Sequence, residues 1–357
     1  MKRTICRNMS KHVHPLKAWT NVLIVVSLLW LVGACSDDNP TSSNNRSTLD
    51  AGRKYTSWFY NGETLDLWEN ASDKLKMLFD GEVANFSIYC QMARLQLGRE
   101  TGVINERVIQ MEALEVYERA AHFENLSDPY AGLWALDSSH HIHLVEFRPL
   151  PPEAPSRFLD YETKTSLRLP FDDEWLVLWG GRSIQDNYHA DTPDQRFAYD
   201  FIVIENGYFY DGAGRRNEDY YAFGKSIVAP GDGIVVETED SIHDNPPGEE
   251  NLTQEGFLGN YVVIDHENGE YSLLFHFQQG SMAVRPGERV TAGQFLGLCG
   301  NSGASDMPHL HYHLQTTPEP LGLGAEGLPI QFRSYRANGK VVTRGEPVRG
   351  QQVQHLN

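Results

Sequence analysis

The sequence predicts a mainly β protein, in which an antiparallel-sheet domain follows a small α+β domain. The chain has 357 residues, more than one ordinary domain and enough for two. Within residues 50–98, apolar residues recur at helical spacing, whereas beyond about residue 157 short strand-like runs alternate with Gly and Pro. Hydrophobic residues make up 40% of the chain and charged residues 22%, which is sufficient for packed cores.

The amino terminus has the features of a secretion signal. Residues 1–34 contain five basic residues, no acidic residue and an apolar run, Val22–Val32. This run is shorter than the roughly 20 residues that span a bilayer. Its end, Val32-Gly33-Ala34-Cys35, resembles a bacterial lipobox, which implies that Cys35 becomes the lipidated first residue. We therefore expect a lipoprotein signal peptide over 1–34 and a lipid-anchored protein of the bacterial cell envelope, facing outside the cytoplasm. A plain cleaved signal or an uncleaved anchor is the alternative.

A flexible tether and a small α+β domain are predicted next. Residues 35–49 are rich in Ser, Asn, Asp and Thr, as in flexible linkers. Residues 50–150 begin with helical spacing, including a helix over Val83–Leu97 closed by Gly98. Strand-like runs follow at Val108–Phe123, Ala131–Leu136 and Ile142–Phe147. The aromatic residues of the helical part either build its core or line a binding pocket: Trp58, Tyr60 and Trp68.

The amino-terminal half contains one histidine cluster, residues 140–143. His141 and His143 would share one face of a strand, as metal ligands can, but no carboxylate has matching placement in the sequence. We interpret the cluster as a solvated turn. Cys90 and Cys299 fall in different predicted domains, so we expect two free buried thiols.

A β-sheet domain is predicted over residues 157–350. Its strand-like runs are Trp175–Trp179, Ala198–Ile204, Gly233–Glu237, Tyr261–Asp265, Tyr271–Phe275, Gln294–Leu298 and Leu310–Gln315. Within the last run, His309, His311 and His313 alternate with apolar residues, which places the three rings on one face of a strand. Three histidines on one face are poorly explained by core packing, because burying an unpaired imidazole is costly. The pattern therefore indicates a metal or catalytic site.

The order of several segments resembles peptidase family M23, the zinc metallopeptidases of the LytM and lysostaphin type. These segments are residues 187–189, 198–201, 223–235, 259–266, 271–276, 284–297 and 300–313. The resemblance covers about residues 180–345. It implies one zinc ion per site, with metal ligands at His189, Asp200 and His311, and catalytic residues at His276 and His309. It also implies that a zinc-activated water is the nucleophile and that the two catalytic histidines assist it.

This sequence departs from the family pattern at two positions. The family usually spaces its first ligand pair as His-x-x-x-Asp, whereas ten residues separate His189 from Asp200 here. A loop must therefore bulge out between the two ligands. His313 stands where the family often has Glu. It is a hydrogen-bond partner of a ligand, a core or surface histidine, or, as the least favoured alternative, a further metal ligand.

Composition narrows the choice of partner. The chain has 48 acidic and 30 basic residues, a formal charge of −18, and loss of residues 1–34 would leave −23. Nucleic acid is a poor partner for such a surface. The resemblance implies a zinc metalloendopeptidase that hydrolyses peptide bonds in peptidoglycan cross-links or stem peptides during cell-wall remodelling. The alternatives are a non-enzymatic regulator of wall hydrolases, and an amino-terminal domain that binds the target.

Overall fold

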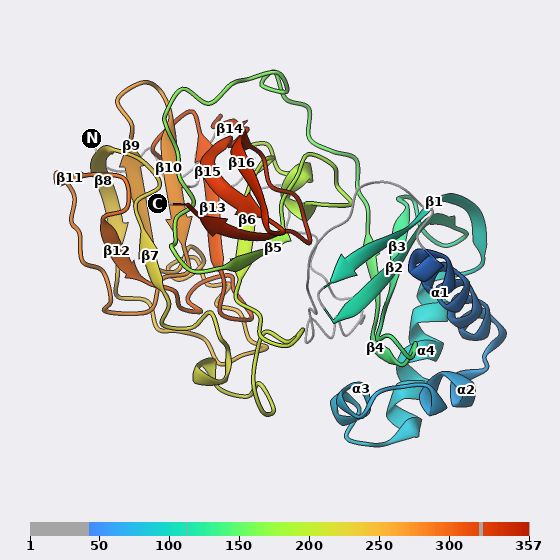
Figure 1. Ribbon diagram of the computed structural model, residues 1–357. Coiled ribbons are helices and arrows are strands. Elements are labelled where there is room, and N and C mark those ends of the chain that lie inside the picture. The colour runs from blue at the N-terminus through green and yellow to red at the C-terminus, as the bar shows by residue number, and fades with distance from the viewer. Residues whose placement is uncertain (1–42, 112, 321–323, 357) are drawn as a thin grey trace, which may run out of the picture.

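The computed structural model describes residues 43–111, 113–320 and 324–356. The predicted signal peptide, Cys35 and residues 36–42 of the predicted tether lie outside these residues. Figure 1 shows two parts, a helical and sheet part formed by the first half of the chain and a larger β-sheet part formed by the second half. No helix in the described ranges is both long and apolar enough to cross a bilayer.

The secondary structure confirms the predicted fold class. The first part contains four helices and four strands: α1 (Ser43–Asn61), α2 (Thr64–Glu69), α3 (Asp73–Leu78), α4 (Val83–Leu97), β1 (Glu100–Met111), β2 (Leu114–Phe123), β3 (Tyr130–Leu136) and β4 (Ile142–Pro149). The second part contains strands and two short 3₁₀-helices: β5 (Trp175–Trp179), η1 (Tyr188–Asp191), β6 (Tyr199–Ile202), η2 (Asn217–Asp219), β7 (Ser226–Val228), β8 (Gly233–Glu239), β9 (Tyr261–Asp265), β10 (Tyr271–Phe275), β11 (Arg289–Val290), β12 (Phe295–Leu298), β13 (Leu310–Gln315), β14 (Gly327–Leu328), β15 (Phe332–Ala337), β16 (Lys340–Gly345) and β17 (Gln352–His355).

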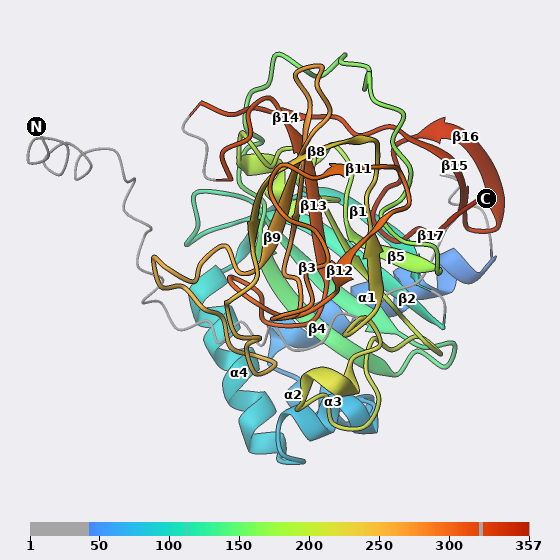
Figure 2. The same ribbon diagram turned by 90° about the vertical axis from the view of Figure 1, so that its left-hand side faces the viewer.

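The amino-terminal sheet is a four-stranded antiparallel meander, β1-β2-β3-β4, with a different neighbour on each face. Side chains alternate across a strand. Tyr117 and Trp134 therefore face the helices, whereas Leu133 and Leu144 pack against apolar residues of the second part. The sheet is thus the middle layer between the helices and the larger β-sheet part (Figures 1 and 2). The single strand predicted over Val108–Phe123 is wrong: the chain reverses between Met111 and Leu114 and forms the β1–β2 hairpin.

Helix α1 begins inside the predicted tether. Residues 43–49 are helical, so the prediction of a flexible segment is wrong for this stretch. Thr48 is buried, and its hydroxyl donates a hydrogen bond to the Glu115 carboxylate on β2. Ser and Asn, the residues that suggested a linker, are also the residues preferred where helices begin. A tertiary contact with the sheet, which composition does not reveal, favours the helix.

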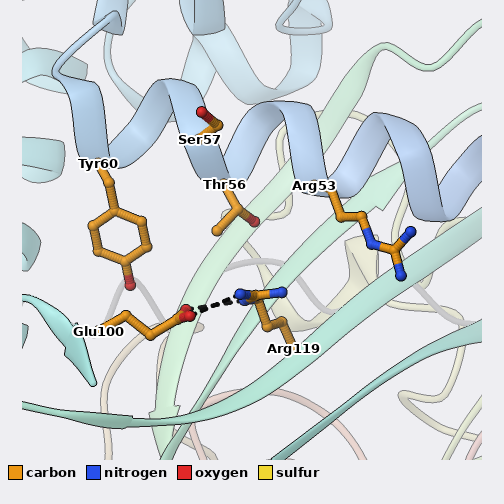
Figure 3. A pocket seen from close by; sticks show the side chains of 6 residues that line it. All are labelled: Arg53, Thr56, Ser57, Tyr60, Glu100 and Arg119. Atoms are coloured by element: carbon orange, nitrogen blue, oxygen red, sulfur yellow. Dashed lines mark hydrogen bonds and ion pairs between the residues drawn. The ribbon is translucent and has the colours of Figure 1, made fainter. Parts of the chain in front are cut away.

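A pocket of about 370 Å³ lies between α1 and the sheet (Figure 3). Its charged lining residues are all paired. Arg119 donates to Glu100, also in the lining, at 2.7 Å, and Arg53 donates to Glu106 of β1, outside the lining, at 2.7 Å. The pocket is lined by Arg53, Thr56, Ser57, Tyr60, Glu100 and Arg119. Of the three aromatic residues predicted to line a pocket or build the core, Tyr60 lines this pocket and also packs against the core, as Trp58 and Trp68 do.

The second part is built on a large antiparallel sheet whose centre carries the histidine-rich strand. The strand order is β11-β8-β9-β10-β13-β6-β5-β17-β15-β16, and β14 pairs with β13. Strands β5, β9, β10 and β13 have the predicted bounds. Strand β13 lies between β10 and β6, and its apolar side chains, such as Tyr312, pack into the core on the opposite face from the histidines.

The two parts share a buried ionic cluster as well as apolar contacts. Glu118 of β2 is fully buried and accepts hydrogen bonds from Arg107 (2.9 Å), Arg148 (3.2 Å) and Arg349 (2.9 Å). The three guanidinium groups hold the pKa of Glu118 at about 2, although burial alone would raise it. Because Arg349 belongs to the carboxy-terminal segment, this cluster fastens the amino-terminal sheet to the second part. Cys90 and Cys299 are free and buried, as predicted.

Candidate metal centre and cleft

Strand pairing brings Asp200 and His311 together although they lie 111 positions apart in the sequence. The two residues are direct partners in the antiparallel register of β6 and β13. Both side chains are almost completely buried. Side chains of directly opposite residues lie about 4.5–5.5 Å apart at Cβ, so this register suffices to juxtapose the two groups.

His189 approaches the same point from η1. Asn187, fully buried, closes the loop between His189 and β6: its side-chain nitrogen donates to the carbonyl oxygens of Gly181 (3.2 Å) and Ala198 (3.1 Å). The unusual ten-residue interval after His189 is therefore a loop whose ends are fastened together. Nε2 of His189 lies 3.5 Å from Oδ2 of Asp200.

His189, Asp200 and His311 form a compact set of metal-ligand types. One side-chain donor atom from each lies within 4.8 Å of the others, and all three residues are buried. In the described part of the chain, no Lys or Arg forms a salt bridge with Asp200, whose ionic partners are all histidines. Two imidazoles and a carboxylate with a fourth position open form a donor set typical of catalytic zinc sites.

Hydrogen bonds determine which nitrogen of His311 carries its proton. The side-chain nitrogen of Gln315 donates to two backbone carbonyl oxygens, at 2.9 and 2.8 Å, so its Oε1 faces Nε2 of His313 at 3.2 Å. That nitrogen of His313 must be the donor. Burial lowers the pKa of His313 well below its usual range, so the ring is neutral and its Nδ1 accepts from Nε2 of His311 at 3.0 Å. In its neutral form, His311 therefore presents a lone pair at Nδ1, 2.8 Å from Oδ1 of Asp200.

The same reasoning applies to His189. Because the side-chain nitrogen of Asn187 faces carbonyl oxygens, its Oδ1 accepts from the backbone N–H of His189 (3.2 Å) and from its Nδ1 (2.8 Å). Burial lowers the pKa of His189 to about 3, so the ring is neutral and its Nε2 carries a lone pair. That lone pair is on the nitrogen closest to Asp200.

With His311 in its neutral form, two imidazole lone pairs and a carboxylate thus converge with no hydrogen between them. Burial alone would raise the pKa of Asp200, but the surrounding histidines hold it well below its usual range, so the group is an anion. Electron-pair donors this close repel one another unless a cation lies among them. The donor set therefore fits a bound metal cation, and the hydrogen-bonded partners Asn187 and His313 orient the rings as is common around protein metal sites.

His276 and His309 adjoin this cluster, as the sequence predicted for the catalytic pair. Nδ1 of His276 donates to the Ser302 carbonyl at 2.7 Å, and Nδ1 of His309 donates to the Met307 carbonyl at 2.8 Å. In the neutral form, each ring therefore presents a lone pair at Nε2. Nε2 of His309 lies 3.7 Å from Oδ1 of Asp200. The two ring centroids are 4.7 Å apart. Burial lowers the pKa of His276 well below its usual range, which keeps it a proton acceptor.

His276 directly follows β10 and adopts a left-handed backbone conformation, with φ of 66°. Such a conformation is uncommon for a residue other than Gly. Here it is held by hydrogen bonds on both sides, because the Gly300 N–H donates to the His276 carbonyl at 2.9 Å while the ring is fixed by Ser302. The glycine-rich segment before β13 therefore positions a histidine from another strand.

An open cavity of about 360 Å³ borders the cluster. Asp200 and His309 line it, together with Tyr188, whose ring packs edge-on against Trp179 at 5.3 Å. Glu146 of β4 lines the same cavity, so the amino-terminal sheet forms part of its wall. Such a cavity lies within the usual size range of small-ligand sites.

The second histidine cluster is a solvated turn only in part, because His141 is exposed beside the turn whereas His143 lies on β4. His143 is buried, and the Asp137 carboxylate lies between two rings, at 3.1 Å from Nδ1 of His141 and 3.2 Å from Nε2 of His143. Asp137 lies before the turn and the histidines lie after it, so the alternation of residues along a strand did not reveal that they are in contact. These residues are not part of the metal-ligand group described above.

Sequence reasoning missed the residues that orient the rings. Asn187 carries a recognisable signal, because it precedes His189 by two residues and a buried Asn must satisfy all its polar atoms. Gln315 continues the alternation of His309, His311 and His313 on one face of β13, which was a second available signal. No feature of the sequence indicated that the carbonyl of Ser302 would orient His276, since its position depends on tertiary structure.

A family model matches part of the carboxy-terminal β-sheet part of the chain. Residues 218–322 match the model of peptidase family M23. This segment includes His276, His309 and His311 and begins after His189 and Asp200.

Two relatives named as peptidoglycan DD-endopeptidases match this chain over about as many residues as the family model does. The chain is 34% identical over 107 residues to peptidoglycan DD-endopeptidase ShyA of Vibrio cholerae, covering 30% of this chain and 21% of that protein. It is 38% identical over 98 residues to peptidoglycan DD-endopeptidase ShyC of the same organism, covering 27% and 19%. The chain therefore spans about a fifth of the length of these relatives.

Solved structures include the catalytic domain of the antimicrobial peptidase lysostaphin from Staphylococcus simulans. It shares 19% identity, with 44% of this chain and 88% of that chain covered, at a TM-score of 0.26. A TM-score of this size supports no inference about mechanism. The sequence match over residues 218–322 stands independently, and it shows that the chain carries a domain of peptidase family M23.

Proposed function

We propose that this chain is a zinc metalloendopeptidase that hydrolyses peptide bonds of bacterial peptidoglycan. The observation that carries the proposal is the convergence of the lone pairs of His189 and His311 on the Asp200 carboxylate. These three residues would hold the metal. When bound, zinc supplies Lewis-acid chemistry, polarising a carbonyl and acidifying water near neutral pH.

The neighbouring histidines provide the proton transfers. Since the Nδ1 atoms of His276 and His309 donate to carbonyl oxygens, their Nε2 atoms are free to accept a proton from an attacking water. The same atoms, once protonated, can donate it to the leaving amine. Burial lowers the pKa of His276, which suits a proton acceptor, and backbone carbonyl oxygens fix the orientation of both rings.

Peptidoglycan is proposed as the substrate because both cited relatives are named peptidoglycan DD-endopeptidases. The sequence features of residues 1–35 agree with the location of that substrate, outside the cytoplasm. We include in the proposal a lipid anchor at Cys35. Replacing Cys35→Ala should release the protein from the membrane fraction, whereas unchanged lipid attachment would contradict the anchor.

Digestion of purified sacculi tests the enzymatic proposal. The full mature chain should release soluble peptide fragments with new amino termini, detected by mass spectrometry. The His309→Ala variant should retain its metal and lose most of this activity, because it removes a proton acceptor and not a ligand. A zinc-loaded wild-type protein that leaves sacculi and isolated cross-linked muropeptides intact would instead support a non-enzymatic regulator.

A further inference from the structure

The cavity beside the proposed metal centre has walls from both parts of the molecule. The β-sheet part contributes Asp200, His309 and Tyr188, and the amino-terminal part contributes Glu146, Arg148 and Pro149. The apolar contacts and the Glu118 cluster fix this second wall in place. The amino-terminal part is therefore positioned to contact whatever occupies the cavity.

Two charged side chains of β4 point to this side of the sheet, and only one is neutralised within the protein. Arg148 donates to Glu118 at 3.2 Å and to the carbonyl of Gln185 at 2.6 Å, and its guanidinium lies over Trp179. The side chain of Glu146, two residues earlier, accepts no hydrogen bond and forms no salt bridge with any residue in the described ranges. Its carboxylate is thus left facing the cavity without a direct partner.

The surroundings of the cavity compensate this charge only in part, through the more distant charges of Arg148 and Arg349. Asp191 and Glu250 also line it, and Arg148, its basic lining residue, is already engaged by Glu118. Burial raises the pKa of Glu146 to about 7 and also raises the pKa of Glu250. An incompletely solvated carboxylate without a partner destabilises the folded protein, and such groups are characteristic of functional sites.

We propose that Glu146 binds a cationic group of the peptide substrate, a side-chain or terminal ammonium, beside the proposed metal centre. An ammonium in the cavity would provide the partner that the protein itself does not. The amino-terminal part is then a wall of the substrate site and helps to select the substrate. This inference rests on the proposed function for the nature of the ligand as a peptide.

Equilibrium binding tests the inference separately from hydrolysis. The probes are a stem-type tetrapeptide with lysine at its third position and the same peptide acetylated on the lysine side chain. The full mature protein should bind the free amine about tenfold or more tightly than the acetylated form, since a charged hydrogen bond is worth at least about 1.5 kcal/mol. Increasing salt should reduce the difference.

The variant Glu146→Gln should remove most of this preference and leave binding of the acetylated peptide unchanged. Glu69→Gln, which alters an exposed carboxylate on α2 away from the cavity, should retain the preference. Equal binding of both peptides by the wild-type protein, or a preference that survives in Glu146→Gln, would overturn the inference. Hydrolysis of sacculi in parallel reports on the proposed function, which would stand if only the peptide preference were missing.

Discussion

Nδ1 of His311 lies 2.8 Å from Oδ1 of Asp200, and in the neutral ring neither atom carries a hydrogen. The proton is drawn to the far side of the ring by His313, which is in turn fixed by Gln315. In that form of the ring, the pair fits a metal site and not an ordinary buried hydrogen bond. It also identifies the residues outside the ligand set on which metal affinity depends.

Replacing His313 should weaken metal binding without removing a ligand. His313→Leu deletes the acceptor for Nε2 of His311, and changes of this kind typically cost about 10–100-fold in metal affinity or activity. His313→Gln offers a side-chain oxygen at a similar position and should recover much of the loss. Zinc affinity measured by competition with a chromophoric chelator checks this. Equal affinity in the wild type and His313→Leu would show that the hydrogen-bond chain does not orient His311.

The metal-free protein should lose stability as pH falls below about 6.5. Burial lowers the pKa of His189 to about 3 and those of His276 and His313 well below their usual range. Below about pH 6.5 the unfolded chain therefore binds protons at these histidines that the folded chain does not. Their contribution to the free energy of unfolding is fully present above the pKa of the unfolded chain and decreases as the pH falls toward the pKa of the folded chain. Each such histidine contributes a slope of about 1.4 kcal/mol per pH unit within that window.

Urea unfolding of the metal-free protein at several pH values between 7.5 and 5 measures this slope. The His313→Gln variant is the matched control and should show a shallower dependence, since one titrating group is missing. A free energy of unfolding that stays constant over this range would contradict the neutral, buried state of the three rings.

The Glu118 cluster should be essential for stability. Glu118→Gln leaves Arg148 and Arg349 buried without their counterion, and breaking a buried ion pair typically costs about 3–5 kcal/mol. Glu124→Gln disrupts only an exposed pair with Arg99 and should cost less than about 1 kcal/mol. Denaturant unfolding at pH 7.5 compares the two, and losses of similar size would contradict the role of the cluster in joining the two parts.

The proposed substrate contact should carry a stability cost. The pKa of Glu146, raised to about 7 by burial despite the charges of Arg148 and Arg349, exceeds its usual value of 4.5. The folded protein holds this proton more tightly than the unfolded chain does. The resulting gain in the free energy of unfolding is fully present below about pH 4.5 and is lost as the pH rises through 7. Glu146→Gln should therefore raise the melting temperature at pH 8 and have little effect at pH 4.5. A lower melting temperature at pH 8 would show that the carboxylate has a stabilising partner.

Local patterns predicted much of the fold, and the residues of the candidate site came from the resemblance to family M23. Leu310–Gln315 was predicted with its observed bounds, because strict alternation of His with Leu and Tyr leaves only one way to form a buried strand. The resemblance over about residues 180–345 selected His189 and Asp200 in spite of the ten residues between them. Their approach depends on the loop closed by Asn187, which no spacing rule anticipates.

The errors arose where tertiary contacts outweigh local composition. Residues 43–49 resemble a linker, yet the contact between Thr48 and Glu115 fixes them in α1. The apolar run after Val108 reads as one strand, because the reversal before Leu114 lacks a Gly or Pro turn signal. Asp137 lies before a turn, so its position between His141 and His143 became visible only in the fold.

The proposed metal centre can be tested by a single comparison, the zinc content and sacculus hydrolysis of the mature wild-type protein and its Asp200→Asn variant. Asp160→Asn, an exposed change outside the cluster, is the control. We predict about one zinc ion per chain in the wild-type and control proteins. Asp200→Asn should lose more zinc affinity and hydrolysis than the roughly 100-fold that is lost when a hydrogen-bond partner of a metal ligand is replaced. Retention of stoichiometric zinc and hydrolysis by Asp200→Asn would contradict the site.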